Sequence, residues 1–301
     1  MTGRNPTNSL IPPASENGGT PNACFLCGAS RKATAVKDNL KIAFCRPCGL
    51  GFQETFPPAI AAIYEDISYY DAWWGSHADG ERHVRLLKDM TAQWVLNQMR
   101  PFLPSGARLL EIGCAFGYFL QAAQKKSYRV CGIEISAAAD QARKSGLEVH
   151  SQPLEAVAFP ARSFDAVVML DVIEHFNDPE SLLKEIRRVL KETGIVALIT
   201  PDVNSLARRL LGRKWPHFKQ EHLYYFSRKS LSKLLQRQGF DVLTFKTAKK
   251  GMSASYLASH SAQYGNLPKF MNACLRGAFF SSAPLLVPSG LFCLATSKRV
   301  P

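Results

Sequence analysis

Short apolar runs alternate with amphipathic stretches along most of this 301-residue chain. Within residues 179–191 the apolar side chains recur at helical spacing and form one stripe along a predicted helix. Strands and helices that alternate in this way predict an α/β fold, with a parallel sheet covered by helices on both faces. The runs with the apolar character of buried strands lie near 107–113, 128–134, 147–150, 164–170 and 195–200.

The same pattern continues on both sides of these five strands. A helix is expected at about 80–99, and another begins after Ser227, whose hydroxyl suits an N-cap, and ends at Gly239. Two further strands are expected at 240–247 and 290–298.

The first predicted strand runs into a tight turn that opens a helix, with Gly113 and Gly117 at its ends. This geometry is typical of a nucleotide-type cofactor site at the carboxyl edge of an open α/β sheet. The next strand ends at Glu134, where a carboxylate could bind the hydroxyls of a ribose. The alternative is that the glycines only permit a sharp connection and that Glu134 is a solvated strand end. Ala115 replaces the second glycine of a dinucleotide fingerprint, which favours a cofactor without a pyrophosphate.

Several motifs resemble those of the class I S-adenosylmethionine (SAM)-dependent methyltransferases, over about residues 80–299. The pair Glu174-His175, followed by Asp178-Pro179, is similar to the ubiquinone-type O-methyltransferases. The segments that carry the resemblance are 111–117 for motif I, 132–134 for the acidic second strand end, 163–179 for the fourth strand and its loop, 194–201 for the fifth strand, and 214–227 for a bacterial subgroup.

The resemblance implies SAM as the cofactor and a Rossmann-like, mostly parallel sheet of seven strands with the last one antiparallel. Two positions depart from the family pattern. The middle glycine of motif I is Ala115, and near the end of the third strand Glu155 is the acidic residue within 152–155 that could reach the adenine. The residues expected to bind the cofactor are Glu111, Gly113, Cys114, Ala115, Gly117, Glu134, Ile135, Leu154, Leu170 and Asp171.

Methyl transfer to a hydroxyl needs a group that removes the hydroxyl proton. Histidine suits this role because its ordinary pKa is near 6.5. The candidates are His175, after the fourth strand, and His222, in the segment after the fifth strand. The alternative is that either histidine caps a helix or orients a loop. Residues 215–226 are expected to close over the substrate.

Four cysteines near the N-terminus form two pairs, Cys24-x2-Cys27 and Cys45-x2-Cys48, with 17 residues between the pairs. This spacing is typical of a four-thiolate zinc ribbon, whose closed coordination makes the Zn²⁺ structural. Disulfides and a redox pair are the alternatives. The other cysteines, at positions 114, 131, 274 and 293, lie in apolar surroundings and are expected to be buried small side chains.

The chain is expected to have four parts. Residues 1–22 are a disordered tail, 23–53 the zinc ribbon with short strands at 41–44 and 51–53, 54–78 an aromatic connector, and 79–301 the SAM-binding domain.

No signal peptide and no run of transmembrane length is visible, so a cytoplasmic location is expected. The apolar stretch 278–294 is interrupted by prolines and a glycine, and we expect a loop that leads into the last strand.

The formal net charge is +13. Such an excess suggests nucleic acid, a phospholipid surface or an acidic substrate as partner, or it only solvates the surface. We expect a SAM-dependent methyltransferase that methylates the hydroxyl of a small-molecule, sugar-linked or lipid-linked acceptor. The alternatives are an RNA methyltransferase, a sugar C-methyltransferase and a non-catalytic SAM-binding module.

Overall fold

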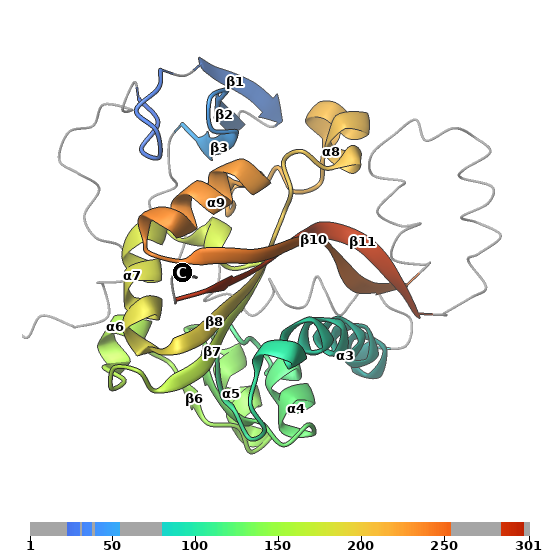
Figure 1. Cartoon of the computed structure of the whole chain (residues 1–301). Coiled ribbons are helices and arrows are strands. Elements are labelled where there is room, and N and C mark those ends of the chain that lie inside the picture. Colours follow the sequence, from blue (N-terminus) through green and yellow to red (C-terminus); the bar gives the residue numbers. More distant parts are fainter. Residues whose placement is uncertain (1–22, 31, 38–39, 55–79, 254–283, 298–301) are drawn as a thin grey trace, which may run out of the picture.

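The computed structural model describes residues 23–30, 32–37, 40–54, 80–253 and 284–297. The expected tail, most of the connector and Cys274 lie outside these ranges. Within them, a seven-stranded sheet with the strand order β10-β11-β8-β7-β4-β5-β6 forms the centre of the molecule (Figure 1). Its strands are β4 (Arg108–Ile112), β5 (Arg129–Ile133), β6 (Val149–His150), β7 (Phe164–Leu170), β8 (Leu190–Thr200), β10 (Asp241–Ser253) and β11 (Pro284–Thr296).

The direction of these strands confirms the predicted fold class. Neighbours from β6 to β8 are parallel, whereas β11 pairs antiparallel with both β8 and β10. The last strand of the chain is therefore the antiparallel strand that the resemblance implied.

Helices cover both faces of the sheet. One apolar core lies under α3 (Gly80–Met99), α4 (Tyr118–Gln124) and α5 (Ala138–Lys144). The other lies under α6 (Leu154–Val157), α7 (Pro179–Val189) and α9 (Arg228–Arg237), and it also includes side chains of the N-terminal ribbon. The shorter elements are η2 (Arg100–Phe102), η3 (Ile173–His175), α8 (Leu206–Leu211) and η4 (Gly212–Lys214).

Local sequence sets where the helices begin. The side chain of Asp178 accepts hydrogen bonds from the backbone of Glu180 and Ser181, which caps α7, and Ser227 caps α9 as predicted. The end of α7 differs from the prediction, because Leu190 has an extended backbone and begins β8. The fifth strand is therefore longer than the predicted 195–200.

The loop predicted for residues 278–294 is wrong from Pro284 onward, because these residues belong to β11. A proline removes one backbone donor and is tolerated where no strand needs that donor. Pro288 satisfies this condition, because β8 pairs with β11 only from Leu291 to Thr296. Around Pro288 the strand pairs with β10 alone among the described strands.

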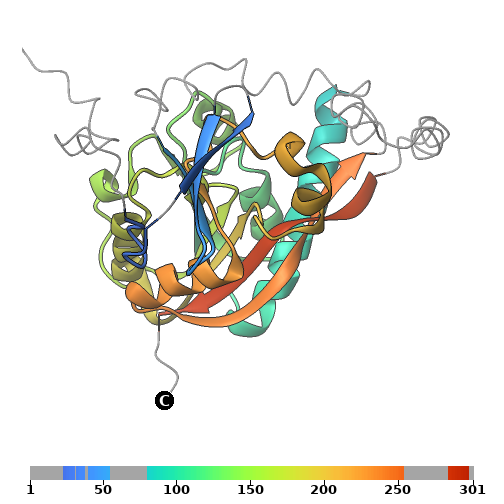
Figure 2. The same cartoon turned by 90° about the horizontal axis from the view of Figure 1, so that it is seen from above.

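The ribbon is a small sheet that includes part of the C-terminal half of the chain. Its strands, in order, are β1 (Lys32–Lys37), β2 (Leu40–Cys45), β3 (Leu50–Gln53) and β9 (Tyr224–Tyr225). Figure 2 shows the ribbon strands crossing above the yellow and orange segments of the core. The ribbon is thus joined to the core by a continuous ladder, and the predicted strands 41–44 and 51–53 form its middle.

None of the helices in the described part of the chain has the length and apolar character needed to span a bilayer.

Candidate cofactor and acceptor site

The turn after β4 has a backbone that favours glycine at both ends. Gly113 and Gly117 have φ values of +71° and +74°. A Cβ on Gly117 would lie 2.3 Å from Cδ1 of Leu147, and one on Gly113 would lie 2.6 Å from Cγ2 of Val172. Ala115, which stands where the family pattern has a glycine, has a φ of +44°. Its backbone therefore adopts the left-handed conformation that is strained for an alanine.

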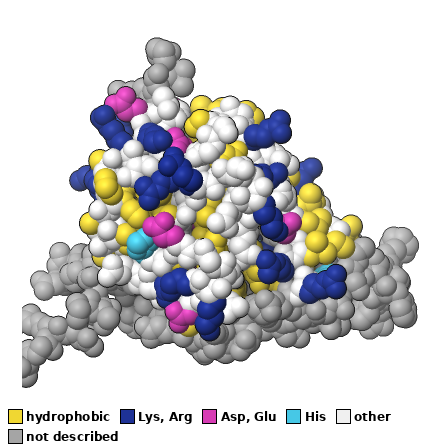
Figure 3. Space-filling view, turned by 90° about the horizontal axis from the view of Figure 1, so that it is seen from below, with side chains coloured by type: hydrophobic (Ala, Val, Ile, Leu, Met, Phe, Trp, Pro, Cys, Tyr) yellow, Lys and Arg dark blue, Asp and Glu magenta, His cyan; other side chains and the backbone are white. Residues whose placement is uncertain are grey.

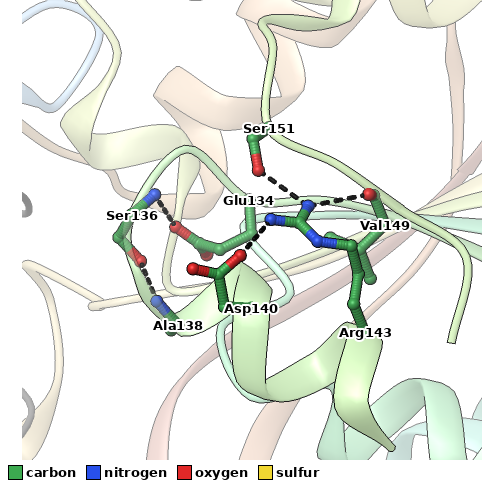
Figure 4. A network of polar contacts seen from close by, with 7 residues as sticks. All are labelled: Glu134, Ser136, Ala138, Asp140, Arg143, Val149 and Ser151. Carbon is green, nitrogen blue, oxygen red and sulfur yellow. Dashed lines mark hydrogen bonds and ion pairs between the residues drawn. The ribbon is translucent and has the colours of Figure 1, made fainter. Parts of the chain in front are cut away.

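The carboxylate of Glu134, directly after β5, lies against this turn. Its Oε2 accepts a hydrogen bond of 2.8 Å from the backbone N–H of Ala115, and its Oε1 accepts one of 2.9 Å from Ser136. Figure 4 shows this loop beside Arg143, which donates to the carbonyl of Val149 and so ties α5 to the end of β6. Each carboxylate oxygen has two acceptor positions, so Glu134 retains capacity for two ribose hydroxyls.

Glu111 on β4 supplies a second indication that a ligand belongs here. Its Oε2 is buried and has no hydrogen-bond partner among the described residues. Burial, and then the charge of Glu134, hold the pKa of Glu111 well above its usual value. The glycine turn, the spare acceptor positions of Glu134 and this unpartnered oxygen together fit the polar part of SAM.

The other predicted cofactor residues lie at the same edge, because parallel strands end on the same side. Cys114 and Leu154 are buried in the two apolar cores. Leu170, the last residue of β7, is partly exposed, and Ile135 is 40% exposed. Leu170 and Ile135 are therefore accessible at this edge, whereas Cys114 and Leu154 are enclosed.

Asp171 follows β7 with a φ of +59° and pairs with Lys250 of β10, whose Nζ lies 2.6 Å from its Oδ1. Desolvation raises the pKa of Asp171, but the Lys250 ammonium outweighs it, and the pKa lies below its ordinary value. Asp171 is therefore an anion at neutral pH. This pairing favours a role in shaping the site over a role as a base.

Three histidine rings cluster beyond the end of β7. The ring centroids of His175 and His222 are 4.8 Å apart, and His217 stacks on His222 at 6.0 Å. Burial lowers the pKa of His175 and lowers that of His217 to about 4. Burial, and then His175, place the pKa of His222 well below its usual range. All three rings are therefore neutral at pH 7, which is the form that accepts a proton.

The two predicted catalytic histidines differ in access and in hydrogen bonding. His175 is partly exposed, and its Nδ1 donates a hydrogen bond of 2.8 Å to the carbonyl of Glu221, which leaves Nε2 as the basic nitrogen. His222 is 5% exposed, and its Nδ1 has no partner among the described residues. The structure thus places both histidines together and gives His175 the better access.

Glu174, between β7 and the histidines, is fully buried. Its Oε2 accepts a hydrogen bond from Thr200, whereas its Oε1 has no partner among the residues that the structure describes. Burial, and then the charge of Asp171, raise the pKa of Glu174 to about 8. One carboxylate oxygen of Glu174 and one ring nitrogen from each of His175 and His222 all lie within 4.8 Å of one another.

The aromatic side chains of the segment 215–226 pack against the ribbon. Trp215, Phe218 and Tyr225 are buried and pack with Ile42 of the ribbon. The hydroxyl of Tyr224 donates to the carbonyl of Asn177. The aromatic side chains of this segment therefore join the ribbon to the core, and the closing of the segment over the substrate stays a prediction.

The four cysteines of the ribbon converge. Their sulfur atoms all lie within 4.8 Å of one another, with Cys24 and Cys48 3.6 Å apart and Cys27 and Cys45 3.3 Å apart. Ligand atoms on a tetrahedral zinc with Zn–S bonds of 2.3 Å are about 3.8 Å apart. The cysteines are not disulfide-bonded, and Cys114, Cys131 and Cys293 are buried as predicted.

A model of the methyltransferase domain family matches residues 83–244, more than half of the chain. The chain belongs to this family. It is 26% identical over 209 residues to a ubiquinone biosynthesis O-methyltransferase of Cereibacter sphaeroides, an alignment that covers 62% of this chain and 84% of that protein. A ubiquinone biosynthesis O-methyltransferase of Dinoroseobacter shibae is 30% identical over 171 residues, with coverage of 52% and 66%.

A solved structure of a SAM-dependent methyltransferase from Thermotoga maritima has the same fold. It superposes with a TM-score of 0.51 and 22% identity, and the match covers 80% of this chain and all of that chain. The protein is thus a SAM-dependent methyltransferase with a Rossmann-like core, and it needs a methyl acceptor.

In this methyltransferase we expect Glu134→Ala to weaken SAM binding about ten- to a hundredfold. The loss of charge-assisted hydrogen bonds to this carboxylate should cost about 1.5–3 kcal/mol in total. Titration calorimetry of SAM into both proteins measures the change, with Glu192→Ala as the control on an exposed carboxylate near the amino end of β8, at the opposite edge of the sheet. Equal affinity of wild type and Glu134→Ala would place the cofactor elsewhere.

Two residues of the methyltransferase site were missed from the sequence. Nothing in the sequence indicated that Lys250 or Gln53 would contact this site. Both lie far along the chain from the groups they contact, so no local motif could have identified them.

Proposed function

We propose that this methyltransferase transfers the methyl group of SAM to a hydroxyl of a small-molecule, sugar-linked or lipid-linked acceptor. The observation that carries the proposal is the neutral histidine pair beside the end of β7, at the same sheet edge as the glycine turn. The likeness to ubiquinone biosynthesis O-methyltransferases supports oxygen as the methyl-accepting atom.

In this proposal the bound SAM supplies an electrophilic methyl group. The turn at Gly113–Gly117 and Glu134 hold the cofactor, and Glu111 satisfies its spare hydrogen-bonding capacity with it. His175 accepts the hydroxyl proton at Nε2, because its Nδ1–H is directed to the carbonyl of Glu221. His222, which is buried, orients His175 by ring contact.

We also propose that Cys24, Cys27, Cys45 and Cys48 hold a structural Zn²⁺. The convergence of four sulfur atoms in a closed cluster supports this, since a tetrahedral thiolate site leaves no open position for catalysis. The backbone N–H of Gly28 donates to the carbonyl of Cys24, and that of Gly49 to the carbonyl of Cys45, which shapes both knuckles.

RNA is the second candidate acceptor, because of the net charge of +13. Figure 3 shows Lys and Arg side chains spread over one face among uncharged ones rather than gathered into one patch. Several Lys and Arg side chains of the described residues are paired with carboxylates, such as Arg188 with Glu185 and Lys191 with Asp165. This distribution favours a small acceptor over a nucleic-acid-binding surface.

The test is transfer of a labelled methyl group from SAM to fractionated metabolites, lipid extracts and total RNA. The proposal expects label in a small or lipid-linked product, released as a methyl ether. Label in RNA, with binding that weakens steeply as salt rises, would replace it with the second candidate. Label on nitrogen or carbon would contradict O-methylation.

A further inference from the structure

Gln53, the last residue of β3, connects the ribbon to the loop before β9. Its side chain is buried, with 3% exposed. The amide nitrogen Nε2 lies 3.1 Å from the carbonyl oxygen of Lys219, 2.6 Å from that of Gln220 and 2.9 Å from that of His222. An amide nitrogen carries two hydrogens, so these three carbonyls share them. One side chain thus fixes the path of most of this loop.

The main chain adds to this connection. The backbone N–H of Gln53 donates a hydrogen bond of 2.9 Å to the carbonyl of Leu223. Beyond it, Phe52 pairs with Tyr224 and Gly51 with Tyr225 in the ladder between β3 and β9. The loop 219–223 is therefore held from the ribbon by both side-chain and main-chain hydrogen bonds.

On its other side, the same loop contacts the residues of the proposed methyl-acceptor site. The carbonyl of Glu221 accepts the hydrogen bond from Nδ1 of His175, which fixes the ring and its tautomer. The backbone N–H of Leu223 donates to the carbonyl of Glu174 at 2.8 Å. His222 belongs to the loop itself. A displacement of this loop would therefore move the histidine pair.

We propose that Gln53 is a positioning residue for methyl transfer, because it holds the loop 219–223 so that His175 and His222 keep their places at the acceptor site. In addition to forming a folded module, the ribbon then helps to position the histidines of the acceptor site. The kinetic consequence rests on the proposed function, whereas the ordering of the loop does not.

Other contacts attach the ribbon to the core without touching the loop 219–223. Arg237 of α9 donates a hydrogen bond of 2.9 Å to the carbonyl of Phe25, between the first two cysteines. The ring of Phe25 meets that of Tyr224 edge to face, with centroids 5.4 Å apart. Loss of the Gln53 amide should therefore loosen the loop while the ribbon stays attached.

The test compares Gln53→Leu, Gln53→Glu and the control Arg237→Met. In Gln53→Leu, which has no donor, amide hydrogens of residues 219–223 should exchange faster, and turnover should fall by about 10²-fold, the effect of a small misplacement of catalytic groups. Gln53→Glu, protonated by burial, keeps one donor and should give an intermediate loss. SAM affinity should stay near the wild-type value in both.

Arg237→Met should speed exchange near Phe25 and leave turnover near the wild-type value. The proposal is overturned if loop exchange and turnover in Gln53→Leu equal those of the wild type, or if Arg237→Met loses as much turnover as Gln53→Leu. If Gln53→Leu fails to fold, Gln53→Glu supplies the comparison. If no acceptor is methylated, faster loop exchange in the Gln53 variants still supports the ordering role, so the two failures are distinguishable.

Discussion

His175→Ala should lower turnover by about 10²–10⁴-fold, which is the usual contribution of a general base. His175 is the partly exposed member of the histidine pair, and its Nδ1–H is directed to the carbonyl of Glu221, so Nε2 is the nitrogen that carries the basic lone pair. SAM affinity should be almost unchanged, because the glycine turn follows β4 and Glu134 follows β5, whereas His175 follows β7. The measurements are turnover with the identified acceptor and titration of SAM.

The pH dependence gives an independent check of the same role. A base must be neutral, so kcat/KM should rise with pH and level off above the pKa of His175. Burial lowers that pKa, so the inflection should lie below the ordinary value of about 6.5. In His175→Ala this inflection should be absent.

His222→Ala is the comparison for His175→Ala. Its ring is buried beside His175 and His217. Loss of the ring should therefore lower the midpoint temperature of thermal unfolding as well as the turnover rate. Near-native turnover in both variants would show that neither histidine removes the proton.

Loss of one ribbon cysteine, as in Cys48→Ala, should remove the bound zinc and strongly reduce turnover. Structural zinc sites bind with about 10–16 kcal/mol at pH 7, so the metal-free ribbon should lose its order. The structure extends the expected damage beyond the ribbon, because β3 pairs with β9 next to the loop that carries His222. The central sheet should keep its far-ultraviolet signal, since its strands pair independently of the ribbon.

Metal analysis of protein purified without chelator should give about one zinc per chain in the wild type and close to none in Cys48→Ala. Cys293→Ala is the matched control, because Cys293 is also a buried cysteine but lies on β11, away from the cluster. Its zinc content should equal that of the wild type. Disulfides between the four cysteines, or wild-type protein without metal, would contradict the zinc proposal.

Local patterns in the sequence were enough for the fold class and for the positions of the glycine turn and of Glu134 at one edge of the sheet. The alternation of strands and helices depends on side-chain periodicity within each segment, and the turn at Gly113 and Gly117 depends on two φ values that glycine adopts readily. The spacing of the cysteine pairs likewise reflects short knuckles that local chain geometry permits. The acidic strand end at Glu134 follows from its place directly after β5.

The acceptor side was decided only by the tertiary structure. Gln53 meets the carbonyl of Lys219 across 166 positions of sequence, and Lys250 meets Asp171 across 79. The sequence proposed His175 and His222 as equal candidates, and only their packing distinguishes the partly exposed ring from the buried one. Pro288 likewise indicates a loop until the chain shows which side of β11 lacks a partner. These features depend on which distant segments pack together, and no periodicity or motif within one segment encodes that information.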